Sequence, residues 1–163
     1  MLSSKLPESV MIVIKKNLLG LISLGVVLLV FFFWWFSHPV MIVDVHKDDD
    51  FSFVLVKNFP LTDKGKIDWW MDNKDMLEKR YGIPQSTSSG FFVITFWDFS
   101  DGYKEAGKYD RLCFNDIPTN KKCIDKNKLL TVENNKRKEL LFTVDDGRYL
   151  MKGSGETIKI NRE

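Results

Sequence analysis

The chain is poor in the residues that build catalytic and metal centres. It has two histidines and two cysteines among 163 residues, and His38 and His46 lie far from Cys113 and Cys123. The two cysteines would need two further ligands to complete a zinc site. There is no His-Glu metalloprotease motif, nucleophile-elbow serine or phosphate-binding glycine loop with its lysine. Because a histidine-dependent triad would have to use His46, we predict a protein that is not an enzyme and holds no metal or cofactor.

An excess of charge of one sign is also missing beyond the N-terminus. Residues 1–17 carry three lysines and one glutamate, which leaves 21 basic and 21 acidic residues in the rest of the chain. A formally neutral domain lacks the basic face by which proteins hold nucleic acid. We therefore expect no nucleic-acid partner.

One long apolar run is present, and it contains no charged residue from Leu18 to Phe36. As a helix it would reach roughly 28 Å, close to the ~30 Å hydrocarbon core of a bilayer. It lacks the polar stripe of a soluble core helix and the small-residue cleavage site of a signal peptide. Trp34 and Trp35 are typical of a membrane interface. The run therefore predicts an uncleaved transmembrane anchor in contact with the lipid bilayer.

The charges that flank the anchor predict its orientation. Lys5, Lys15 and Lys16 precede it, whereas the acidic run Asp48–Asp50 follows it. Because basic residues near a span tend to stay in the cytoplasm, the C-terminal part is expected outside, which in a bacterium is the periplasm. The predicted organisation is a cytoplasmic tail (1–17), a transmembrane helix (18–36) and a periplasmic domain (37–163) of an inner-membrane protein.

The cysteine pair Cys113 and Cys123 favours a disulfide. An even number of cysteines in an oxidising compartment is typical of a structural bridge, and closing this loop would contribute ~2.5 to 3 kcal/mol in the chain-entropy model. A metal site is the alternative, and too few histidines are present to complete it.

The pattern of the exported part predicts an α+β fold, with an antiparallel sheet packed against one main helix. Segments rich in β-branched and aromatic residues, such as "VMIVDVH", "FSFVLVKNF" and "FFVITFWDF", indicate about seven strands. The helix is expected between Thr62 or Asp63 as N-cap and Gly82 and Pro84 as stop signals. The C-terminal segments are separated by short turn sequences and resemble a meander.

The combination of "VLVKNFPLTDKGKIDWWMDNKDMLEKRYGIP", "TFWDFSDGYKEAGKYDRLCFNDI" and "KNKLLTVEN" behind an N-terminal span resembles a known family. It is similar to the enterobacterial inner-membrane proteins grouped as domain of unknown function 943, over nearly the whole chain. The resemblance implies a membrane location. It implies no activity and no site residues.

Two groups of acidic side chains are candidate sites. Asp48–Asp50, with Asp44 and His46 nearby, could bind a cation, but they lack the spacing and central glycine of a calcium loop and are expected to form a solvated turn. Asp98 and Asp101 could act as paired carboxylates, and charged turns explain them more simply.

The predicted helix has two apolar sides. Its main apolar face comprises Ile67, Trp70, Met71, Leu77 and Tyr81, and Lys74 falls on this face, where it should snorkel or pair with a carboxylate. Trp69 and Met76 point almost oppositely. They pack inside the domain, or one of them is simply exposed, or they form a partner surface.

Together these observations predict a non-enzymatic, single-pass protein whose periplasmic domain binds another envelope protein. One version is an immunity-type protein that intercepts a toxin. The alternative is an envelope enzyme or small-ligand sensor, which would need a pocket in the periplasmic domain.

Overall fold

The computed structural model describes residues 20–32, 38–85, 90–135, 137, 139–153 and 155–160. It divides into two compact units, Met1–Pro39 and Val40–Glu163. Residues 20–32 of the first unit are helical. No helix among the described residues combines the length and apolar character needed to cross a membrane. Both ends of the predicted anchor, with Trp34 and Trp35, lie outside the described residues.

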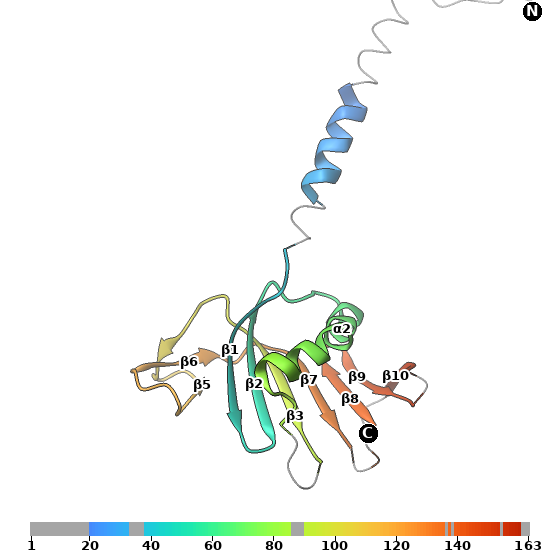
Figure 1. The fold of residues 1–163 in the computed structure, drawn as a ribbon. Helices are drawn as coiled ribbons and strands as arrows, with labels where there is room; N and C mark the ends of the chain where they lie inside the picture. The colour runs from blue at the N-terminus through green and yellow to red at the C-terminus, as the bar shows by residue number, and fades with distance from the viewer. Residues whose placement is uncertain are drawn as a thin grey trace, which may run out of the picture. The chain divides into compact units, whose positions relative to one another are not determined.

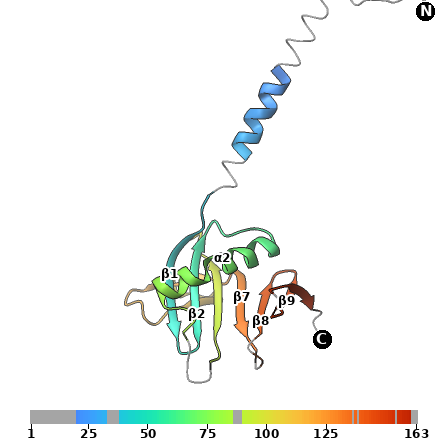
Figure 2. The same cartoon turned by 45° about the vertical axis from the view of Figure 1, so that its right-hand side comes forward.

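The second unit is an α+β domain built on a large sheet and a small one, as Figures 1 and 2 show. The large sheet has seven strands in the order β1-β2-β3-β7-β8-β9-β10, and the small sheet has three in the order β4-β6-β5. In chain order the elements are β1 (Met41–Asp48), β2 (Phe51–Lys57), α2 (Asp63–Tyr81), β3 (Val93–Asp98), β4 (Lys104–Glu105), β5 (Arg111–Cys113), β6 (Lys121–Asp125), β7 (Lys128–Asn134), β8 (Leu140–Val144), β9 (Gly147–Met151) and β10 (Thr157–Ile160).

The α+β class is confirmed, and the large sheet is antiparallel as predicted except for one pair of strands. Strands β2 and β3 pair in parallel, from Phe51 opposite Val93 to Val56 opposite Asp98. The chain between them forms α2, which crosses the face of the sheet (Figure 2). The helix brings the chain back to the end of the sheet at which β2 begins. A helix between two neighbouring strands produces a parallel pair, because only a long crossover can start the second strand at the same end as the first.

Helix α2 begins and ends where the sequence predicts. The Thr62 side chain accepts a hydrogen bond from the Gly65 amide at 3.1 Å, and Gly82 closes the helix in the left-handed region at φ 62°. Glycine suits this position because it pays no Cβ penalty there. Lys74 is exposed, and its expected snorkelling stays a prediction. The buried lysine is Lys66, whose Nζ lies 2.9 Å from Asp145 Oδ2.

Strand β2 explains why the large sheet has a core on each face. Val54 and Val56 point toward α2 and join the main core, which includes Trp70, Leu77, Phe96 and Phe142. Leu55 points the other way and packs with Phe99, Phe114 and Ile124 beneath the small sheet. Side chains alternate between the two faces of a strand, so a strand covered on both faces must be apolar throughout. The continuous run "FVLV" meets this requirement.

Candidate functional site

A network of polar side chains lies beneath the small sheet, where that sheet covers β1. Asp44 and His46 come from β1, and their register partners on β2 are Leu55 and Phe53, so both face the smaller core. Tyr103 precedes β4, and Asp116 lies in the loop after β5. Three segments distant in sequence therefore meet around one imidazole.

His46 is the centre of this network and is only 5% exposed. Its Nδ1 lies 2.7 Å from Asp116 Oδ2, and its Nε2 lies 2.8 Å from the Tyr103 hydroxyl. Tyr103 in turn donates to Asp44 Oδ2 at 2.8 Å. The Phe114 ring stacks on the imidazole with centroids 3.8 Å apart. Both ring nitrogens and one ring face are thus occupied by the protein itself.

The direction of the hydrogen bonds follows from counting protons. The Asp116 carboxylate accepts from Nδ1–H, and Tyr103 gives its only proton to Asp44. The contact between Nε2 and the Tyr103 oxygen completes the network, and the role of Nε2 in it depends on the imidazole tautomer.

The phenol of Tyr103 is held in its protonated form. Burial raises its pKa well above the ordinary value near 10, and the hydrogen bond and charge of Asp44 and the charge of Asp116 raise it further. A phenol in this state donates a hydrogen bond but does not act as a nucleophile or base at physiological pH. The network is consequently suited to holding the small sheet against β1.

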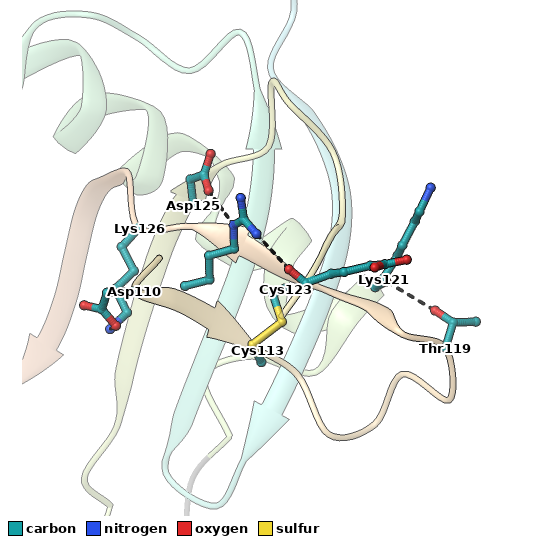
Figure 3. Close-up of a disulfide and its surroundings, with 9 residues drawn as sticks. Asp110, Cys113, Thr119, Lys121, Cys123, Asp125 and Lys126 are labelled. Atoms are coloured by element: carbon teal, nitrogen blue, oxygen red, sulfur yellow. Dashed lines mark hydrogen bonds and ion pairs between the residues drawn. A yellow bond between two sulfur atoms is a disulfide. The ribbon is translucent and has the colours of Figure 1, made fainter. Parts of the chain in front are cut away.

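The small sheet is also closed by a disulfide and by ion pairs (Figure 3). Cys113 and Cys123 face each other across β5 and β6 and are joined, which confirms the predicted pairing. Asp125 accepts from Arg111 Nε at 3.0 Å and also from Lys104. The hydrogen bonds from Lys104 and Arg111 lower the pKa of the Asp125 carboxyl. This pairing therefore persists down to more acidic pH than an isolated carboxylate would allow.

The acidic residues considered as a possible cation site belong to two different parts of the structure. Asp49 and Asp50 form the turn between β1 and β2, with Asp49 at φ 48°, as expected for a charged hairpin turn. Asp44 and His46 instead belong to the buried network. In the part of the chain that the structure describes, no three His, Cys, Asp or Glu side chains are grouped to hold a metal ion.

The two side chains predicted as a possible partner surface pack against the main core of the domain. Trp69 is half-buried and contacts the rings of Phe59 and Phe96, with centroids 5.2 and 5.7 Å apart. Met76 is also half-buried and packs on the main core. A partner role for these two residues stays a prediction. Asp98 accepts from Ser100 and Asn127, and Asp101 accepts from Lys104, so both belong to local turn contacts.

Replacing His46 by phenylalanine should keep the stack on Phe114 but remove both ring hydrogen bonds. We expect the free energy of unfolding to fall by about 1 to 2 kcal/mol, because hydrogen bonds to charged groups are worth more than neutral ones. The cost stays modest because the Asp44 and Asp116 side chains are 46% and 58% exposed and can regain water.

A double-mutant cycle identifies the source of this loss. His46→Phe and Tyr103→Phe should couple by at least ~0.5 kcal/mol in denaturant unfolding, since they share a bond. Tyr149→Phe is the matched control, because its hydroxyl donates to Asp63, the first residue of α2, outside this network. Equal coupling of His46 to both tyrosines would contradict the network.

Comparison with known proteins gives one result. The comparisons with curated proteins and with solved structures find no match. A family model described as "Enterobacterial putative membrane protein" matches residues 13–161, which is most of the chain and includes the segments on which the resemblance rested. The chain belongs to this family, the enterobacterial putative membrane proteins of domain of unknown function 943.

Proposed function

We propose that the chain is a single-pass inner-membrane protein whose exported domain binds another envelope protein through its small sheet. Support for the anchor comes from the uncharged run Leu18–Phe36, the lysines before it and the membrane description of the family. The Cys113–Cys123 disulfide supports export, because such bonds persist in oxidising compartments.

The observation that carries the binding proposal is an exposed aromatic side chain on the loop between β4 and β5. Tyr109 is 65% exposed. Lys108 Nζ and the Arg111 guanidinium lie 5.5 and 5.6 Å from its ring centroid. Tyrosine and arginine are enriched in the energetic centres of protein interfaces. An aromatic ring flanked by two cations suits a partner surface that offers carboxylates and an apolar contact.

The loop that carries Tyr109 is fastened at both sides. Arg111 donates to the Glu105 carbonyl at 2.8 Å and to Asp125 at 3.0 Å, and Lys126 pairs with Asp110 (Figure 3). The disulfide closes the neighbouring strands. A surface that is ordered before binding loses less conformational entropy when the partner arrives. The disulfide, the ion pairs and the His46 network therefore all serve to present one rigid surface.

The ligand-sensor alternative has weaker support. A hollow of about 190 Å³ is lined by Lys128, Leu129, Thr143, Val144 and Asp145. This is smaller than the ~300 to 1,000 Å³ of typical small-molecule sites. An immunity-type role would be the special case of the proposal in which the bound partner is a toxin.

Site-specific photo-crosslinking in intact cells tests the proposal. The full-length chain carrying p-benzoylphenylalanine at Tyr109 should yield one discrete protein adduct, and the same probe at the half-exposed Phe51 should not. Tyr109→Ala should leave the melting temperature nearly unchanged, because exposed substitutions usually stay within ~0.5 kcal/mol. The same change should abolish the adduct formed by a probe at Lys108. Adducts of equal yield at positions 51 and 109, or none at 109, would contradict binding through the small sheet.

A further inference from the structure

We propose that the loop between β2 and α2 contacts the membrane surface, with the Leu61 side chain entering the interface. The inference rests on the proposed anchor and adds a second contact of the protein with lipid. It concerns residues 58–62, "NFPLT".

The loop is rigid, yet it presents a leucine to solvent. Phe59 is buried in the main core, where its ring stacks on Phe96 with centroids 5.3 Å apart. Pro60 packs on the first turn of α2, where a Cβ at Gly65 would lie 3.0 Å from the proline Cβ. The Thr62 carbonyl accepts from the Lys66 amide at 2.9 Å. Leu61, between these fixed points, is 81% exposed.

The contacts of its neighbours therefore hold this leucine in an exposed position. Among the large apolar side chains described in the second unit, Leu61 is the most exposed. Single exposed apolar residues are common on protein surfaces, so the exposure alone decides nothing. Its position in the domain supplies the second observation.

The loop lies at the end of the sheet to which the anchor is joined. Four residues separate Phe36, the last residue of the predicted span, from Met41 at the start of β1. The five Cα-to-Cα steps between the two residues reach at most about 18 Å. Met41 pairs with Lys57, the last residue of β2, and the loop follows directly (Figure 1). Met41 is itself 57% exposed. The short connection thus keeps this end of the domain near the bilayer surface.

Charge indicates what kind of membrane contact this end can make. Lys57 and Lys64 flank the loop, but Asp98 ends β3 and Asp101 follows it. Strand β3 ends at the same side of the sheet as β2 because the two strands are parallel. With both signs present, attraction to anionic headgroups is weak. The contact is therefore mainly apolar, made by Leu61 and by Met41 at the same end of the sheet, and it should depend little on ionic strength.

Photo-crosslinking to lipid tests the inference in the full-length protein, reconstituted into bilayers of phosphatidylethanolamine and phosphatidylglycerol. The probe p-benzoylphenylalanine replaces Leu61, Phe51 or Leu28 in turn. Phe51 is the matched control, since it is 47% exposed but lies at the opposite end of β2, about 20 Å away. Lipid adducts are expected at positions 61 and 28 and not at 51, with the same yield at low and high salt.

A second variant separates docking from mere proximity. With the probe at Met41, Leu61→Asp should lower the lipid-adduct yield by about tenfold, which corresponds to about 1.4 kcal/mol. Leu61→Met should retain it. Adducts at 28 without adducts at 61 would overturn the surface contact and leave the anchor standing. Absence of adducts at position 28 would overturn the anchor, and with it both proposals.

Discussion

Trp69→Ala is expected to lower the free energy of unfolding by about 2 to 4 kcal/mol, because truncating an aromatic side chain in a packed cluster removes buried surface and leaves a cavity. The Trp69 ring contacts Phe59 and Phe96, which connect the β2–α2 loop to the centre of the large sheet. Denaturant unfolding of the full-length protein in detergent measures the change. Tyr109→Ala is the matched control, since that aromatic side chain is exposed and should cost little.

The same experiment decides between the two interpretations of Trp69 and Met76. If they form a partner surface, Trp69→Ala would leave unfolding almost unchanged and weaken partner capture directly. A variant that is as stable as the wild type would therefore contradict the core role that the ring contacts indicate.

Removing the disulfide should have a comparably large effect. The Cys113→Ser, Cys123→Ser variant is expected to lose about 2.5 to 3 kcal/mol, because the bridge restricts the unfolded chain over a separation of 10 residues. Reductant should lower the free energy of unfolding of the wild type by the same ~2.5 to 3 kcal/mol and leave that of the variant unchanged.

The thiols also report the compartment in which the domain folds. In cells, alkylation without reductant should label neither cysteine of the wild type. Complete labelling of both cysteines would show that the disulfide is not formed in cells. The main support for an exported domain would then be lost.

Local sequence signals predicted the helix and the disulfide well. Thr62 and Gly82 mark helix ends through backbone chemistry that depends on a few neighbouring residues. Cys113 and Cys123 are close in the chain, so their pairing needs only a hairpin. The parallel β2–β3 pair could also have been inferred, because the predicted order strand, helix, strand is the signature of a crossover.

The histidine network could not be predicted, because its members meet only in the tertiary structure. His46 and Asp116 are 70 residues apart in the sequence, and Tyr103 comes from a third segment. The one local signal was the alternation of Asp44 and His46, which places two polar side chains on the same face of a strand rich in β-branched residues. The same limit explains Lys66, whose burial depends on Asp145 from the distant β8–β9 turn.

The place of β1 at the edge of the large sheet has a mechanical consequence. Within the described part of the chain this strand hydrogen-bonds to β2 alone, and it is the first strand after the predicted anchor. A pulling force transmitted along the chain would act on the Met41–Lys57 pair first and then on each following pair of β1 and β2 in turn. The bonds from His46 to Tyr103 and Asp116 join β1 to the small sheet as well, so they would share that load midway along the strand. In a protein held by the proposed anchor, the histidine network would limit how far tension can peel the edge strand away.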